Sequence, residues 1–250
     1  MKNSIKNLVA YITSGYPDKN FSIDLALTLG ENGVDTLELG VPFSDPVADG
    51  SAIENANHKA LELGFKFQDL LEISKAVAPK VDTLWMGYFN SFYQQNMQEL
   101  IPHAKSLGVN GVIIPDMPYE ESLAYKELFN VYGMANISFV APTDSEERIA
   151  TIVKDAQKFI YMVAYTGITG SGTAEVLQPF LASIKKHTQI PIYVGFGVNE
   201  KTAKEKVKGA DGVIAGSAFI NILLDKQLSK SQKITNCAKL AKKIKELINE

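Results

Sequence analysis

Short apolar runs alternate with longer runs of helical periodicity along the whole chain of 250 residues. The short runs are rich in β-branched and aromatic residues, which is typical of buried strands. Eight such runs are present: LVAYIT (8–13), VDTLELG (34–40), TLWMGY (83–88), GVIIPD (111–116), NISFVA (136–141), KFIYMVA (158–164), IPIYVGFG (190–197) and GVIAGSA (212–218). Eight strands, each followed by a helix, predict an α/β fold of the (β/α)₈ barrel type in a chain of this length.

The expected helices have apolar residues at helical spacing. They include residues 20–31, 52–63, 68–77, 120–131, 145–157, 175–187, 218–224 and 234–250. Two of them fall between the second and third strands, so the barrel should carry extra helices there and near the eighth strand. No linker, low-complexity tract or block of charge divides the chain, and we expect a single domain over residues 1–250.

Composition excludes several classes of protein. A formal charge of −3 gives no reason to expect a nucleic-acid partner. No apolar run approaches the roughly 18 residues that a membrane span needs. The start, MKNSIKNLVAYITSGYP, has too short an apolar run for a signal peptide. A single cysteine, Cys237, suits a reducing compartment. We therefore expect a cytoplasmic protein without a membrane anchor.

Polar residues gather at the predicted carboxyl ends of the strands, where barrel enzymes build their active sites. Glu38 alternates with two leucines in the second strand, so it faces away from them, and an unpaired glutamate in ordinary core would be costly. Asp49 follows in a loop broken by prolines and glycine. Asp116 ends the fourth strand, where it either orients a lid residue or caps a turn. Tyr161, on the sixth strand, either faces the site or packs in the core.

The loops after the last two strands have the composition of a phosphate site. Gly197 and Gly216 would let backbone N–H groups approach a phosphate, and Ser217 adds a hydroxyl. The helix expected at 218–224 would direct its positive end at the anion. The alternative is that these glycines only permit tight turns. A dinucleotide site is disfavoured, because position 200 is Glu where G-x-G-x-x-G requires a third glycine.

The segment AYTGITGSGTAE (164–175) is rich in glycine and hydroxyl residues. It predicts a lid that orders over substrate, with an ordinary surface loop as the alternative. His58, His103 and His187 fall in or beside predicted helices, which argues against a histidine-built metal centre. Cys237 should pack within the closing helix. No lysine ends a predicted strand, which disfavours Schiff-base chemistry.

In this order along nearly the whole chain, the motifs LELGVPFSDPVADG, PDMPYEES, GITG, GFGV and AGSA are similar to those of the tryptophan synthase α subunit family. The resemblance implies a barrel that cleaves indole-3-glycerol phosphate to indole and glyceraldehyde 3-phosphate. It also implies an α₂β₂ complex, in which indole passes through a tunnel to a β subunit that uses pyridoxal phosphate. The chain itself is expected to carry no cofactor and no metal.

The same resemblance assigns roles to individual residues. Glu38 matches the acid/base glutamate, and Asp49 matches the aspartate that bonds the indole N–H. The other roles are the lid (Thr169), the phosphate site (Gly170, Gly197, Gly216 and Ser217), the indole pocket (Tyr11, Met86, Tyr161 and Phe196) and the loop that meets the β subunit (Pro42 and Asp45).

Two features depart from the family pattern. Tyr165 stands where relatives often have arginine or a small polar residue, which affects lid packing. The family's helix before the first strand is expected to be truncated or reduced to MKNSIKN. Two other functions stay open from the residues: an isomerase of a phosphorylated sugar, and an inactive α-like subunit that only binds and activates a β partner.

Overall fold

The structure is a computed structural model that describes residues 5–163 and 174–250. In this part of the chain every paired strand runs parallel to its neighbour, in the order β5-β4-β3-β2-β1-β9-β8-β7-β6. The strands are β1 (Asn7–Thr13), β2 (Thr36–Gly40), β3 (Asp82–Met86), β4 (Gly111–Ile113), β5 (Ala135–Asn136), β6 (Ser138–Val140), β7 (Ile160–Val163), β8 (Ile192–Gly195) and β9 (Gly212–Ala215).

The two ends of this order are consecutive in sequence. Only Ile137 separates β5, which pairs with β4, from β6, which pairs with β7. The sheet therefore curls until its edges meet, and the result is the predicted α/β barrel, nearly closed. The expectation of eight strands was wrong at one point. The run 136–141 changes its hydrogen-bonding partner at Ile137, so it forms two short strands instead of one.

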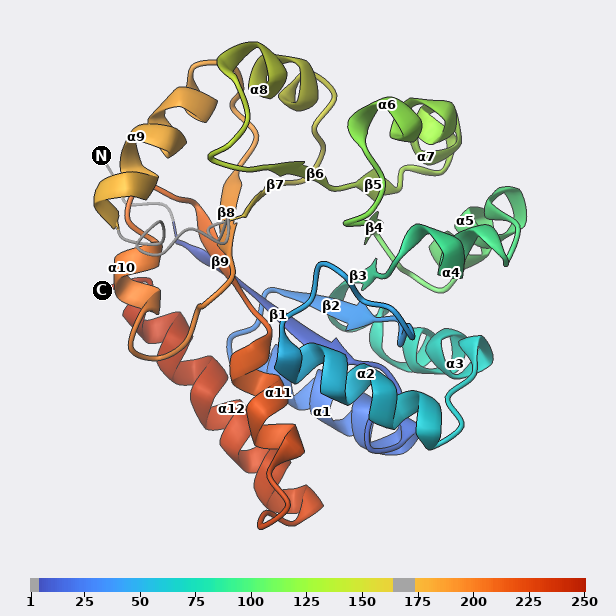
Figure 1. Ribbon diagram of the computed structural model, residues 1–250. Coiled ribbons are helices and arrows are strands. Elements are labelled where there is room, and N and C mark those ends of the chain that lie inside the picture. The colour runs from blue at the N-terminus through green and yellow to red at the C-terminus, as the bar shows by residue number, and fades with distance from the viewer. Residues whose placement is uncertain (1–4, 164–173) are drawn as a thin grey trace.

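Helices surround the strands (Figure 1). They are α1 (Lys19–Glu31), α2 (Ser51–Glu62), α3 (Phe67–Val77), α4 (Phe89–Tyr93), α5 (Met97–Ser106), α6 (Tyr119–Ser122), the 3₁₀ turn η1 (Leu123–Tyr125), α7 (Lys126–Tyr132), α8 (Glu146–Val153), α9 (Ala174–Lys185), α10 (Ala203–Lys206), α11 (Ser217–Leu224) and α12 (Lys230–Leu247). The extra helices expected after the second strand and near the last one are α2 and α11. The helix expected at 120–131 is instead divided into α6, η1 and α7.

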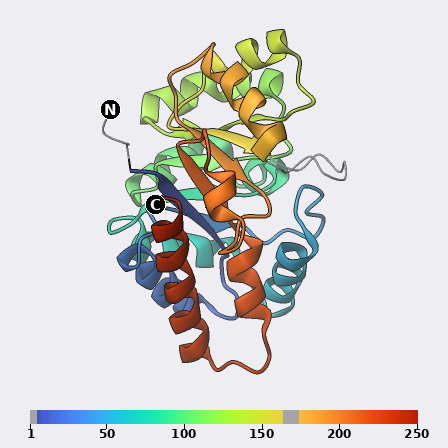
Figure 2. The same cartoon turned by 90° about the vertical axis from the view of Figure 1, so that its left-hand side faces the viewer.

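Local sequence sets several helix boundaries. The Asp18 carboxylate accepts the N–H of Phe21 at 2.8 Å and caps α1. Ser229 and Gln232 form a reciprocal capping box, so α12 begins at Lys230, earlier than the expected 234. In both views α11 and α12 lie side by side (Figures 1 and 2). Cys237 is fully buried in α12, as expected of a packing residue.

Inward-facing residues fill the barrel beneath its mouth. Alternation along the parallel strands directs every second side chain into the interior. The cluster comprises Val9, Leu84, Ile113, Ala135, Ile137, Phe159, Tyr193 and Ile214, with Met86, Phe139 and Tyr161 packed against it. Glu38 pairs with Tyr11 on β1 and with Leu84 on β3, so it belongs to this inward-facing set. Across the described residues, none of the helices has the length and apolarity that crossing a bilayer would require.

Candidate active site

Nine of the predicted site residues line one cavity of about 110 Å³ at the carboxyl ends of the strands. They are Tyr11, Glu38, Asp49, Met86, Tyr161, Phe196, Gly197, Gly216 and Ser217. The cavity wall also contains residues that were not predicted: Ala48, Gly50, Ile53, Ile113, Pro115, Phe139 and Ile214. The cavity thus joins two carboxylates, an aromatic wall and a glycine-rich end.

Glu38 is a buried acid in the wall of this cavity. Its side chain is 2% exposed, and among the described residues its Oε1 has no hydrogen-bond partner. Burial, with the negative charge of Asp49 added, raises the pKa of Glu38 to about 8. A carboxyl that served only to hold the fold would be satisfied by donors. Glu38 is instead protonated at neutral pH and faces the cavity.

Asp49 lies in the loop between β2 and α2, where its neighbours hold it. The Tyr88 hydroxyl hydrogen-bonds the carboxylate, and Asn57 Nδ2 donates to Oδ2 at 3.4 Å. Tyr88 also accepts the N–H of Ala48 at 2.9 Å. Burial raises the pKa of Asp49 to about 6, although these hydrogen bonds act in the opposite direction. At neutral pH the pair therefore consists of a protonated Glu38 and an ionised Asp49.

Tyr11 connects the first strand to the same polar group. Its hydroxyl lies 3.4 Å from Oδ1 of Asn57 and 3.5 Å from Oγ1 of Thr13. Burial and the charge of Asp49 raise the pKa of Tyr11 well above its usual range, so it stays a neutral phenol. Gly40 makes room for it, because a Cβ at Gly40 would lie 2.2 Å from the Tyr11 hydroxyl oxygen.

Sequence reasoning missed Tyr88 and Asn57. The available signal for Asn57 was its place between Ala56 and Ala60 on the buried face of α2, where an amide needs partners. Tyr88 was taken as the last residue of the third strand, but β3 ends at Met86. The sequence positions of Tyr88 and Asn57 therefore gave no indication that their side chains contact Asp49.

Aromatic rings form the wall opposite the carboxylates. Tyr161 stacks on Phe139 with ring centroids 4.9 Å apart, and it meets Phe196 edge-on at 6.3 Å. Tyr161 thus both lines the cavity and packs against the barrel core. The two alternatives predicted for it, a place in the site and a place in the core, both hold. Such a wall can receive a flat heterocycle.

The glycine-rich end of the cavity is formed by two loops. Gly197 has φ of 67°, a conformation that L side chains rarely adopt. Gly216 is the N-cap residue of α11, and Ser217 is its first residue. The positive end of an eight-residue helix, with the N–H groups of its first turn, therefore borders the cavity, an arrangement suited to an anion. The described residues contain no group of three or more His, Cys, Asp or Glu side chains that could hold a metal.

Some predicted residues lie elsewhere. Thr169, Gly170 and Tyr165 are outside the described residues. Asp116 does not line this cavity; its Oδ1 accepts the N–H of Phe89 at 2.8 Å, as the turn-capping alternative expects. The lid residue of the other alternative lies outside the described residues. The three histidines are exposed, as expected, on or beside helices.

In the loop expected to meet a partner, Asp45 is exposed but Pro42 is buried. Phe43 stacks on Tyr88 with centroids 5.1 Å apart, so this loop is tied directly to the residue that holds Asp49. Val47 in the same loop is also exposed, at 85%. Solvent therefore meets Asp45 and Val47, while Pro42 can act only by shaping the loop.

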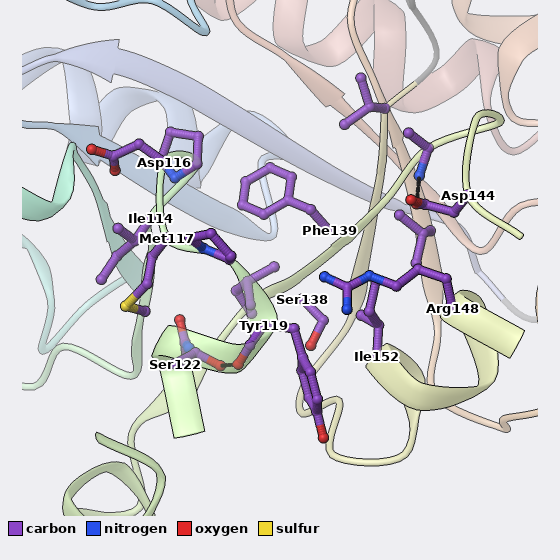
Figure 3. A pocket seen from close by; sticks show the side chains of 17 residues that line it. Ile114, Asp116, Met117, Tyr119, Ser122, Ser138, Phe139, Asp144, Arg148 and Ile152 are labelled. Carbon is purple, nitrogen blue, oxygen red and sulfur yellow. Dashed lines mark hydrogen bonds between the residues drawn. The ribbon is translucent and has the colours of Figure 1, made fainter. Parts of the chain in front are cut away.

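A larger cavity of about 400 Å³ lies next to the first one, between α6 and α8 (Figure 3). Pro115 and Phe139 line both cavities. The Arg148 guanidinium in its wall forms an ion pair with Glu120, and Asp144 accepts the N–H of Ala141 at 2.7 Å. Asp116 also lines this cavity and accepts the N–H of Phe89. The described lining of the larger cavity therefore contains no unpartnered acid such as Glu38.

Comparison with known proteins gives one consistent family. A model of the tryptophan synthase alpha chain family matches residues 1–249. The tryptophan synthase alpha chain of Wolinella succinogenes is 56% identical over 247 residues, covering 98% of this chain and 97% of the relative. That of Petrotoga mobilis is 35% identical, covering 98% and 96%.

Solved structures agree with the family model. Tryptophan synthase subunit alpha from Campylobacter jejuni is 33% identical with a TM-score of 0.86, covering 95% of this chain and 96% of that chain. A ligand-free tryptophan synthase structure from M. tuberculosis is 27% identical with a TM-score of 0.87, covering 98% and 94%.

Proposed function

The chain belongs to the tryptophan synthase alpha chain family, and on that premise we propose that Glu38 and Asp49 carry out its reaction. The family's enzyme is a lyase that cleaves indole-3-glycerol phosphate to indole and glyceraldehyde 3-phosphate, in the last steps of L-tryptophan biosynthesis. The observation that carries the proposal is the unpartnered, protonated Glu38 beside the ionised Asp49.

Glu38 is the acid and then the base. Its proton goes to C3 of the indole ring, which leaves a positive charge on the ring nitrogen. The resulting carboxylate then takes the proton of the hydroxyl on the carbon attached to C3. The bond between these carbons breaks, its electron pair returns to the ring, and the hydroxyl carbon becomes an aldehyde. Each such proton transfer typically contributes about 10²–10⁴-fold in rate.

Asp49 acts on the ring nitrogen. Its carboxylate accepts the indole N–H and stabilises the positive charge that develops there. Because Tyr88 and Asn57 already hold this carboxylate, little reorganisation is needed when the charge forms. Tyr11, Met86, Tyr161 and Phe196 enclose the ring.

The substrate phosphate binds at the glycine-rich end. Backbone N–H groups of Gly197 and Gly216, the Ser217 hydroxyl and the amino end of α11 receive it. The resemblance adds Gly170 to this site and gives Thr169 the role of a lid residue that closes near Asp49. These two residues lie outside the described part of the chain and rest on the sequence motif alone.

The partner is the tryptophan synthase β subunit, in an α₂β₂ complex that passes indole from one active site to the other. The alpha chain family binds no cofactor, and pyridoxal phosphate belongs to the β subunit. We place Asp45, and the loop shaped by Pro42, at the contact with that subunit. We further propose that residues 1–250 form one domain and that the protein is cytoplasmic.

Indole release tests the proposal. The purified chain is incubated with indole-3-glycerol phosphate, alone and with the β subunit, and slow release alone with fast release together is expected. Glu38→Gln should lose cleavage by orders of magnitude while still binding the β subunit. Glu99→Gln, at an exposed position on α5, is the matched control and should cleave normally.

Two results would reject the assignment. Near-normal cleavage by Glu38→Gln removes Glu38 from the mechanism. No cleavage by the wild-type chain in either setting, with the β subunit still activated, identifies an α-like subunit that acts only on its partner.

A further inference from the structure

The cavity carries a negative charge, and so does its substrate. Its lining contains the ionised Asp49 and the protonated Glu38, but among the described residues it contains no lysine or arginine. A phosphate monoester carries about 1.5 to 2 negative charges at neutral pH. Backbone N–H groups and one helix end supply only partial positive charge. A full positive charge near the glycine-rich end would therefore strengthen phosphate binding.

Lys206 lies beside that end of the cavity. It is the last residue of α10, the short helix that follows β8 (Figure 1). A Cβ added to Gly197 would lie 3.6 Å from Cε of Lys206 and 3.7 Å from its Nζ. Lys206 is not among the residues that line the cavity, so its ammonium would act on a bound anion at a distance, past Gly197, and not by direct contact.

The charge of Lys206 is not used elsewhere in the described structure. Two neighbouring lysines are paired, Lys204 with Glu250 and Lys208 with Glu205. Lys206 makes no ion pair with any residue of the ranges 5–163 and 174–250. Its side chain is partly buried, and burial alone lowers the pKa of this lysine, with no carboxylate acting in the other direction. Holding a cation in this position has an electrostatic cost that an incoming anion would relieve.

We propose that Lys206 is an electrostatic positioning residue for the substrate phosphate, acting at a distance past Gly197. The ammonium offsets the repulsion between the phosphate and the Asp49 carboxylate, and it adds to the attraction of the Gly197 backbone N–H. It does not touch the reacting atoms. The inference rests on the proposed function only for the identity of the substrate, because the same charge would attract any phosphate monoester or inorganic phosphate at this end of the cavity.

Lys206→Gln tests this role through the difference between KM and kcat. The variant should raise KM for indole-3-glycerol phosphate about threefold to tenfold, because a charge at this distance is partly screened by solvent. The rate constant kcat should change much less, since the phosphate is bound in both the ground state and the transition state. Lys206→Arg keeps the charge and should restore most of the affinity. The effect should shrink as salt is added.

Lys208→Gln is the matched control. It removes the same charge from the same stretch of chain, but Lys208 is exposed and paired with Glu205, so KM should stay at the wild-type value. Equal KM values for wild type and Lys206→Gln, or equal increases in Lys206→Gln and Lys208→Gln, would overturn the proposal. The loss of affinity could also come with a lower melting temperature that Lys206→Arg does not restore. That result would show that Lys206 has a structural role only.

Inorganic phosphate provides a readout that does not depend on the reaction. Its dissociation constant, measured by titration calorimetry on the full chain, should rise by the same factor in Lys206→Gln, while binding of uncharged indole should not change. If the wild-type chain failed to cleave indole-3-glycerol phosphate, the proposed function would fall. The comparison of phosphate affinities would still decide the role of Lys206.

Discussion

The hydroxyl of Tyr88 hydrogen-bonds the carboxylate of Asp49, and the same oxygen accepts the N–H of Ala48. Tyr88 is 2% exposed and follows β3, whereas Asp49 is in the loop after β2. One phenol therefore fixes the main chain and the side chain of that loop together. The position of Asp49 thus depends on a residue that carries out no chemistry itself.

Tyr88→Phe should lower kcat about tenfold, which is the usual cost of losing one hydrogen bond to a charged group. Because that bond lowers the pKa of Asp49, its loss should also move the acidic limb of the pH–rate profile to higher pH. Steady-state kinetics between pH 5 and pH 9 measure both effects. Tyr93→Phe, 61% exposed on α4, is the control and should match wild type. An acidic limb at the same pH in Tyr88→Phe and wild type would show that this hydrogen bond does not set the pKa of Asp49.

The pH–rate profile of kcat/KM should be bell-shaped. Activity should fall below about pH 6, where Asp49 becomes protonated, and above about pH 8, where Glu38 loses the proton that it donates. In Asp49→Asn the residual activity should have its alkaline limb at lower pH, since the charge of Asp49 helps to raise the pKa of Glu38. The substrate phosphate also titrates near pH 6, so an acidic limb that persists in Asp49→Asn belongs to the substrate. An alkaline limb at the same pH in both proteins would contradict the coupling.

Stability should depend on pH through Glu38. Its pKa is raised from 4.5 to about 8 by folding, so the folded chain binds the proton more tightly than the unfolded chain. The contribution of Glu38 to stability is therefore lost as the pH rises from about 4.5 to about 8. Glu38→Gln does not titrate, so its melting temperature relative to wild type should be higher at pH 9 than at pH 5. A difference that stays constant over this range would show that Glu38 titrates with an ordinary pKa.

Association with the β subunit should depend on the exposed part of the loop after β2. Val47→Asp places a charge at a position that is 85% exposed in the free chain, and it should weaken association at least about tenfold if the partner covers it. Cleavage by the isolated chain should be unaffected. Ile5→Asp changes a residue that is 76% exposed just before β1, at the opposite end of the barrel, and it should associate normally. Titration calorimetry with the β subunit distinguishes the two variants, and equal affinities would place the contact elsewhere.

Periodic patterns in the sequence predicted the barrel because its strands and helices are local. The alternation of Glu38 with two leucines predicted that its side chain points into the barrel. The prolines and glycine that follow predicted a loop there, which places Asp49 at the mouth of the barrel. The family motifs identified the glycine-rich end in the same way, since Gly197, Gly216 and Ser217 are each defined by a few neighbouring residues.

Properties that depend on several distant segments were not predictable. The sequence predicted a single strand at the fifth position, over residues 136–141. In the structure this run pairs with β4 before Ile137 and with β7 after it, so it forms two strands, β5 and β6. Lys206 was not singled out, because its nearness to Gly197 depends on how α10 packs beside the loop after β8.

The amino-acid sequence by itself therefore determined the class of fold, the end of the barrel where the candidate site lies and the two carboxyl groups that we propose to act there. Only the tertiary structure decided their protonation states and their supports, Tyr88 and Asn57. The physical reason is that a pKa reflects the burial and the charges around a group. Those surroundings are assembled from strands and helices that lie far apart along the chain.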